Sequence, residues 1–149
     1  MKPSYQPIFS AHLSLHDVAQ AADAIADWDV EFCQLSEGRL NTQLTVIASE
    51  NITIQKVQFD KPVHQQGASP KGTHTFGFLE YGSDDIKWGA EAGRSDDLML
   101  FSSKGWDVIS QPGFIGHTLS FSEATIDRIN QCLGYEVSVL NNAPSSLVK

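Results

Sequence analysis

The chain has 149 residues, enough for one domain with a sizeable core, and its 41% hydrophobic and 19% charged residues are typical of a soluble globular protein. Its 10 basic and 18 acidic side chains give a formal net charge of −8, which argues against direct contact with nucleic acid. No apolar run approaches the roughly 20 residues of a membrane span, and the first residues lack the apolar core of a signal peptide. We therefore expect a cytoplasmic protein that does not enter a membrane, with Cys33 and Cys132 as buried free thiols.

The first predicted element is a helix over residues 14–26. Apolar side chains three and four positions apart form one helical face, and Ser14 and Asp17 have the spacing of a capping pair. From Asp29 the period changes to two, which predicts strands beginning at Asp29, at Leu40 and at Ile52.

The third of these strands contains a break in its apolar alternation. Val57 and Phe59 would face the side opposite to Ile52 and Ile54 if the strand were regular. We therefore predict a β-bulge near Gln55 or Lys56, and a loop over residues 60–72, where Pro and Gly are dense.

Short strands separated by turn residues follow, at residues 74–81, 86–88, 98–102, 106–110 and 118–121. A second helix then begins at the N-cap Ser122 and ends at Gly134, with an apolar stripe formed by Ile126, Ile129, Cys132 and Leu133. The pattern predicts a mostly β sandwich or barrel with an N-terminal and a C-terminal helix. Residues 136–149 have the composition of a linker.

Residues 28–40, WDVEFCQLSEGRL, resemble the start of the N-terminal cupin-like sensor domain of AraC-type transcriptional regulators. Three later stretches match the same pattern in register: residues 52–57 leading to Pro62, residues 70–72 before 76–78, and residues 93–101. The resemblance therefore extends over roughly residues 8–133. It implies a double-stranded β-helix, a cupin-like jelly roll whose interior can hold a small effector.

In that family the sensor precedes a DNA-binding domain with two helix-turn-helix motifs, which is absent from this chain. The resemblance thus implies a sensor domain over residues 1–135 and a linker-like tail over residues 136–149. The chain would be either a fragment of a longer regulator or a free-standing sensor, and the Asn-, Pro- and Ser-rich tail favours the fragment. Any contact with DNA would be made by the missing domain.

The cupin likeness also raises the question of a metal, which would need two or three His and a carboxylate at one point. His64 lacks the expected companion His and Glu, and His74 departs by one residue from the second cupin metal motif. The paired carboxylates Asp84-Asp85 and Asp96-Asp97 lie beside turn glycines, where a solvated loop is expected rather than an acid/base site. The sequence contains no Gly-x-Ser-x-Gly motif and no comparable cysteine context that would indicate a catalytic nucleophile. We therefore expect no cofactor and no enzymatic activity.

A ligand pocket would need an apolar wall with a few polar groups. His74, Phe76 and Phe78 share one strand face, which we predict to point inward, and Trp88 and Trp106 could supply further wall. Gln34 lies on the face of Phe32 and could offer its amide to a ligand or bond a neighbouring loop. The aromatic residues could equally be plain core.

The leading hypothesis is a regulatory sensor that binds an unidentified small effector and forms a homodimer partly through the last helix. A cupin-type metal-dependent enzyme and a ligand-free dimerisation module remain as alternatives.

Overall fold

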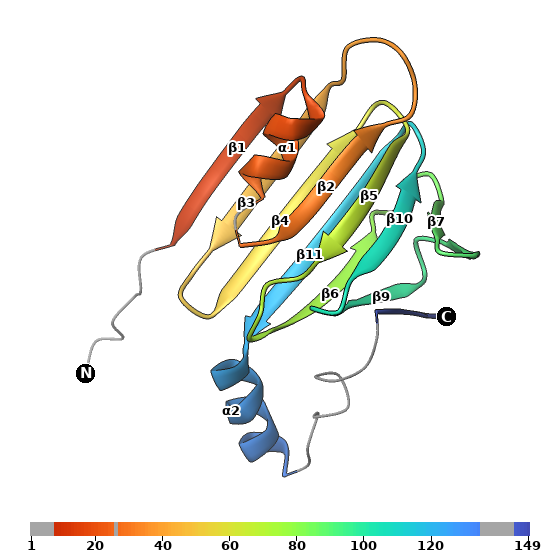
Figure 1. Cartoon of the computed structure of the whole chain (residues 1–149). Coiled ribbons are helices and arrows are strands. Elements are labelled where there is room, and N and C mark those ends of the chain that lie inside the picture. The colour runs from red at the N-terminus through yellow and green to blue at the C-terminus, as the bar shows by residue number, and fades with distance from the viewer. Residues whose placement is uncertain (1–7, 26, 135–144) are drawn as a thin grey trace.

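The computed structural model describes residues 8–25, 27–134 and 145–149, which form two antiparallel sheets and two helices (Figure 1). The larger sheet contains, in spatial order, β1 (Phe9–Leu15), β3 (Thr42–Ala48), β4 (Ile52–Phe59), β11 (Phe114–Ser122), β6 (Thr73–Leu79), β9 (Leu98–Phe101) and β12 (Ser146–Val148). The smaller sheet contains β2 (Asp29–Gln34), β5 (Val63–Ala68), β10 (Trp106–Ser110), β7 (Ile86–Trp88) and β8 (Glu91–Gly93). The expectation of a mostly β fold with two helices is confirmed at this level.

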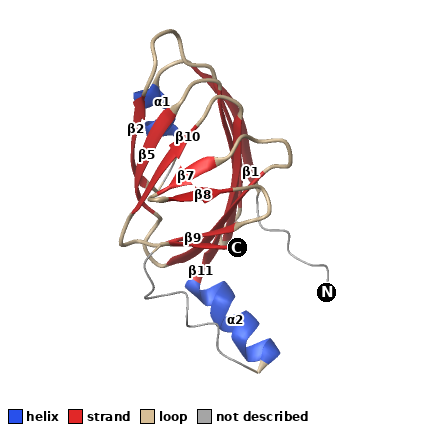
Figure 2. Cartoon of the chain, turned by 90° about the vertical axis from the view of Figure 1, so that its right-hand side faces the viewer, coloured by secondary structure: helices blue, strands red, loops and turns tan. Residues whose placement is uncertain are grey.

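The two sheets pack face to face, and their facing side chains form the core (Figure 2). The Phe32 ring of the smaller sheet lies edge-on to Phe59 of the larger one, with ring centroids 5.5 Å apart, and Phe59 stacks on Phe114. Leu40, Val63 and Leu79 are almost completely buried in the same cluster.

Helix α1 (Val18–Ala24) lies between β1 and β2 and buries Ala21. It is shorter than the predicted helix over residues 14–26, and the proposed capping pair is wrong. Asp17 is the N-cap, accepting hydrogen bonds from the backbone N–H groups of Ala19 and Gln20, whereas Ser14 lies in β1 and bonds Gln43. Residues 9–15 alternate in sequence and pair along their whole length with β3, which outweighs the helical spacing of Leu15 with Val18.

Strand β4 contains no bulge, and the prediction of one is wrong. Its register with β3 and with β11 is unbroken, so Gln55, Val57 and Phe59 face inward while Ile52 and Ile54 face outward. The parity change in the sequence therefore marks apolar side chains on the outer face of the larger sheet.

The predicted loop over residues 60–72 contains strand β5, so that prediction is also wrong. Pro62 precedes the strand, Val63 and Gln65 are buried, and Gly67 lies opposite Val30 of β2. A Cβ at Gly67 would overlap the carbonyl oxygen of Asp29, which explains the glycine within a central strand.

Helix α2 (Glu123–Leu133) confirms the predicted caps. The Ser122 hydroxyl accepts a hydrogen bond from the Thr125 N–H, and Gly134 ends the helix in the left-handed region with φ of 71°. Of the predicted stripe, Ile126 is buried and Ile129, Cys132 and Leu133 are exposed. The helix extends from one end of β11 (Figure 1).

Two further expectations need correction. Cys33 and Cys132 are both exposed, because Cys33 alternates with the inward Phe32 and Cys132 lies on the uncovered part of α2. The last residues of the predicted linker form β12, which pairs with β9 and places Leu147 against the core, while residues 135–144 lie outside the described part of the chain.

Candidate functional site: an apolar cavity between the sheets

The candidate site is a cavity of about 60 Å³ between the two sheets. The larger sheet contributes Val57 of β4 and both Met99 and Phe101 of β9, and the smaller sheet contributes Val30 of β2 and Val108 of β10. The wall is almost entirely apolar, as ligand pockets usually are.

Aromatic rings form one end of this cavity. Trp28, in the connection between α1 and β2, lies edge-on to Phe101 at 5.4 Å and to Trp106 at 6.0 Å between ring centroids. Phe101 also lies edge-on to Trp88 and Trp106, at 5.4 and 5.3 Å. In such contacts the edge of one ring meets the face of another, a favourable arrangement that helps to fix the orientation of the rings.

Polar side chains in the wall include those of Trp106, Gln65, Gln55 and Thr118. The Trp106 Nε1 atom is buried without a hydrogen-bond partner among the described residues. Gln65 donates to the Ser110 hydroxyl at 3.0 Å, and that hydroxyl donates to the Val63 carbonyl, so one of the two Gln65 N–H donors is already bonded. Gln55 is buried, 4% exposed, and points between the sheets.

A second cavity of about 250 Å³ adjoins the first and shares Trp28 and Gln55 with it. Its floor is the inner face of β1 and β3, including Leu13 and Val46, and Phe9 at its edge is exposed. The Trp28 side chain therefore lies between the inter-sheet cavity and a wider space beneath β1.

Of the six residues predicted to bind a ligand, the structure places Trp106 in the cavity wall and Trp88 beside it, against Phe101. Gln34 lies at the end of β2, where its amide donates to the carbonyls of Ser36 and Gly38, the loop-bonding role that the sequence also allowed.

The predicted inward orientation of His74, Phe76 and Phe78 is wrong. Thr75, Gly77 and Leu79 face inward, and the aromatic face of β6 forms part of the outer surface of the larger sheet. His74 is nevertheless buried, 4% exposed, with its Nε2 atom unpartnered among the described residues. Phe78 is exposed and stacks on His117.

Sequence reasoning missed Trp28, Gln55 and Phe101 as wall residues. The signal for Gln55 was present, because it shares strand parity with Val57 and Phe59. The signal for Trp28 is three-dimensional, since its ring reaches the cavity from a connecting segment.

The ionic contacts lie on the outer surface. Glu80 Oε2 is 2.7 Å from both Lys56 Nζ and His117 Nε2, and the hydrogen bond from Lys56, followed by that from His117, holds the pKa of Glu80 below its usual value. His64 Nε2 lies 2.9 Å from Asp107 Oδ2 on the outer face of the smaller sheet. Within residues 8–25, 27–134 and 145–149, no group of three His, Cys, Asp or Glu is arranged to hold a metal ion.

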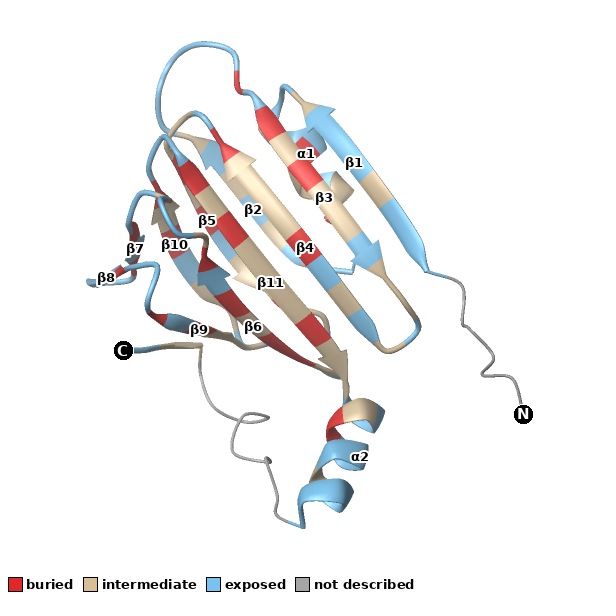
Figure 3. Ribbon diagram, turned by 180° about the vertical axis from the view of Figure 1, so that it is seen from behind, coloured by how far each residue is buried: buried red, intermediate tan, exposed pale blue. Residues whose placement is uncertain are grey.

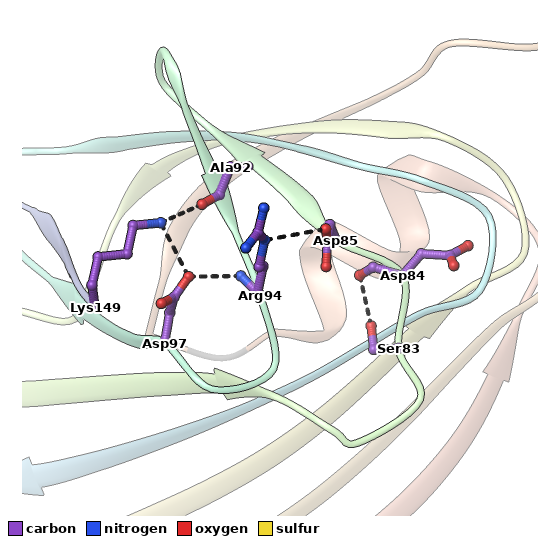
Figure 4. A network of polar contacts seen from close by, with 7 residues as sticks. All are labelled: Ser83, Asp84, Asp85, Ala92, Arg94, Asp97 and Lys149. Carbon is purple, nitrogen blue, oxygen red and sulfur yellow. Dashed lines mark hydrogen bonds and ion pairs between the residues drawn. The ribbon is translucent and has the colours of Figure 1, made fainter.

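A second polar network fastens β12 to the loop before β9 (Figure 4). Asp97 Oδ2 accepts from the Arg94 N–H at 2.9 Å and lies 3.2 Å from Lys149 Nζ, which also donates to the Ala92 carbonyl. The loop that leads into β9, the strand of Met99 and Phe101, is thereby joined to Lys149, the residue after β12.

Comparison of the chain with protein-family models, with curated proteins and with solved structures finds no match. Among the described residues, neither helix has the length and apolar character needed to cross a membrane.

Proposed function

We propose that this protein is a non-enzymatic, cytoplasmic sensor domain that binds a small effector between its two sheets, as the sensor domains of AraC-type regulators do. The observation that carries the proposal is the apolar inter-sheet cavity, whose wall includes Trp106, an indole with a buried Nε1 atom that has no hydrogen-bond partner within the described part of the chain. Such a wall suits recognition of a small molecule.

The strand order supports a jelly roll. The larger sheet contains the spatial order β4-β11-β6-β9, and the smaller sheet contains the spatial order β5-β10-β7-β8. Two four-stranded halves with this order are what a double-stranded β-helix would have, and they support that proposal. Strands β1, β3, β2 and β12 then extend the two halves.

The proposed signal passes from the cavity to the end of the chain through β9. Met99 and Phe101 line the cavity, β9 pairs with β12, and Leu147 of β12 packs against the same core. A ligand that moves β9 would therefore change how β12 is held. An attached DNA-binding domain would read this change, and with a net charge of −8 this chain would make no direct contact with DNA.

We also propose a homodimer that uses the outer face of the larger sheet together with α2. Ile47 and Ile54 are cross-strand neighbours on that face, both exposed, and Leu119 and Phe76 continue the row across β11 and β6. Figure 3 views the larger sheet from this side, with half-buried and exposed residues between the buried ones along its strands and α2 below the end of β11. Exposed apolar rows of this kind mark interaction surfaces.

A thermal-shift screen with chemically diverse small molecules tests effector binding. A ligand at about ten times its Kd should stabilise the protein by about 1.4 kcal/mol and raise Tm by about 3–6 °C. Val57→Phe, which fills the cavity, should abolish that response, while Val148→Phe on exposed β12 should retain it. A hit that stabilises Val57→Phe equally, or a broad screen without hits, would contradict the proposal.

Metal analysis of the protein purified without added metal tests the proposal that the protein is not an enzyme. Stoichiometric iron, nickel, manganese or zinc would contradict a non-enzymatic sensor and favour a cupin-type enzyme.

A further inference from the structure

The chemistry of the cavity wall restricts the class of molecule that it can take. The titratable side chain nearest the cavity is that of His117, but β11 directs it outward, where it bonds Glu80 and stacks on Phe78. The polar groups directed inward are therefore neutral, and they include Gln55, Gln65 and Trp106. A charged ligand would lose its hydration without gaining an opposite charge.

The unpartnered Trp106 Nε1–H specifies one feature of the ligand. An indole nitrogen can only donate a hydrogen bond, and a buried donor without a partner is unfavourable. Gln65 uses one of the two N–H groups of its amide in the bond to Ser110, so the indole is the donor whose only N–H is unsatisfied among the described residues. A ligand carbonyl or ether oxygen near Trp106 would satisfy the indole and leave the Gln65 bond intact.

The size of the site depends on Trp28. The cavity of about 60 Å³ is smaller than the roughly 150 Å³ of an apolar cavity known to hold benzene. Trp28 separates it from the neighbouring space of about 250 Å³, and this residue lies in a connection rather than in a strand. Displacement of the Trp28 ring would join the two spaces into one that holds a single ring. The wider space adds the carboxylate of Asp27 to the lining. Asp27 is exposed, so water screens its charge and it offers little to a cation, while it disfavours an anion.

We infer that the site takes a neutral, mostly apolar molecule of about one ring that displaces Trp28 and accepts a hydrogen bond from Trp106. This inference rests on the proposed function, because it names the ligand class of the same cavity.

Three compounds of similar size test separately whether the ligand must be neutral and whether it must accept a hydrogen bond. Acetophenone is neutral and has an acceptor, ethylbenzene is neutral and lacks one, and benzoate is charged. The chain has three Trp, so a titration of ¹⁵N-labelled protein reports three indole N–H signals, assigned with Trp→Phe variants. Acetophenone should shift the Trp28 and Trp106 signals, with Trp106 moving downfield. Ethylbenzene should bind about three- to tenfold more weakly, and benzoate at least tenfold more weakly.

Trp106→Phe should remove the preference for acetophenone over ethylbenzene, so that the two compounds bind with similar Kd values. Trp88→Phe is the matched control, since Trp88 packs against Phe101 and is not among the wall residues of the cavity, and it should retain the preference. A preference that survives in Trp106→Phe would overturn the hydrogen-bond assignment.

Two other outcomes would overturn the inference in different ways. If benzoate binds at Trp28 and Trp106 more tightly than acetophenone, the ligand class is wrong and the proposed sensor function stands. If none of the compounds shifts an indole signal, the inference fails, and the thermal-shift screen decides separately whether the protein binds small molecules.

Discussion

Gln34 holds the turn that follows β2, and both N–H donors of its amide are used in doing so. Its Nε2 atom donates to the Ser36 carbonyl at 2.7 Å and to the Gly38 carbonyl at 2.6 Å. Gln34→Ala should therefore lower the free energy of unfolding by about 1 kcal/mol, measured by urea denaturation. Gln66→Ala, which removes a bond to exposed Glu31, should cost less than about 0.5 kcal/mol. A loss of ligand binding in Gln34→Ala with unchanged stability would contradict this role.

Asp97 makes the fold sensitive to acid. The Arg94 backbone N–H, and to a smaller extent Lys149, holds the pKa of this carboxyl below its usual value of about 3.8 against the opposing effect of burial. A carboxyl with a lowered pKa in the folded state stabilises the fold above its unfolded pKa and loses this effect as the pH falls through the folded pKa. Stability should therefore decline below about pH 4.

Urea midpoints between about pH 3 and 7 measure this dependence. Asp97→Asn should have a lower midpoint at neutral pH and a smaller decline in acid, with the remaining decline carried by Asp60 and Glu80, whose pKa values are also lowered. Exposed Asp96→Asn is the control and should behave as the unmodified protein does. Equal acid sensitivity in Asp97→Asn and the unmodified protein would refute the assignment.

At the residue scale, strand alternation in the sequence predicts which side chains share a face, but it does not say which face is inside. His74, Phe76 and Phe78 do share a face, yet β11 and β9 pair with β6 so that Thr75 and Leu79 are the inward residues. An aromatic face is the more apolar choice for a core. Here the aromatic side chains of the core are Phe59, Phe101 and Phe114, which come from other strands. The Phe101 ring lies so close to the inward face of β6 that a Cβ at Gly77 would overlap it.

Strand β12 is the element that connects the cavity with the end of the chain. Leu147 packs against the core from this strand, whereas its neighbour Val148 is 46% exposed. Leu147→Ala should lower the free energy of unfolding by about 1–2 kcal/mol, and Val148→Ala by less than about 0.5 kcal/mol. Chemical denaturation measures both. Equal effects of the two substitutions would show that β12 is not packed as described.

At the scale of elements, local signals in the sequence were sufficient for some segments and misleading for others. The caps of α2 and the bounds of β7 and β10 follow from nearby residues, and the structure confirms them. Strand β5 was missed because Pro62 and Gly67 normally indicate a loop. Here Pro62 precedes the strand, and Gly67 permits a close approach by β2, a requirement set by a segment more than 30 residues away.

At the scale of the whole molecule, we expect a homodimer. Sedimentation at about tens of micromolar should show a species of twice the 16.3 kDa chain mass. Ile129→Asp places a charge on the exposed stripe of α2 and should shift the population to monomer, while Gln131→Asp on the same helix should not. A single monomeric species of the unmodified protein at that concentration would contradict the dimer.

The class of fold was predictable as mostly β because turn residues recur between short strands, but the site was not. The cavity is formed by Val57, Phe101 and Trp106, residues from three strands and both sheets, together with Trp28 from a connecting segment. The meeting of these side chains depends on which strands pair and which sheets face each other. No local pattern in a single sequence records that information.

We expect small molecules to reach the apolar space between the two sheets, and a crystal structure of the protein under xenon pressure would show whether they do. Xenon enters apolar cavities without needing a specific polar partner. We expect a xenon peak in contact with Trp28, Phe101 and Trp106, and a lower xenon occupancy at this position in the Val57→Phe variant. Xenon bound at other positions with none between the sheets would contradict it.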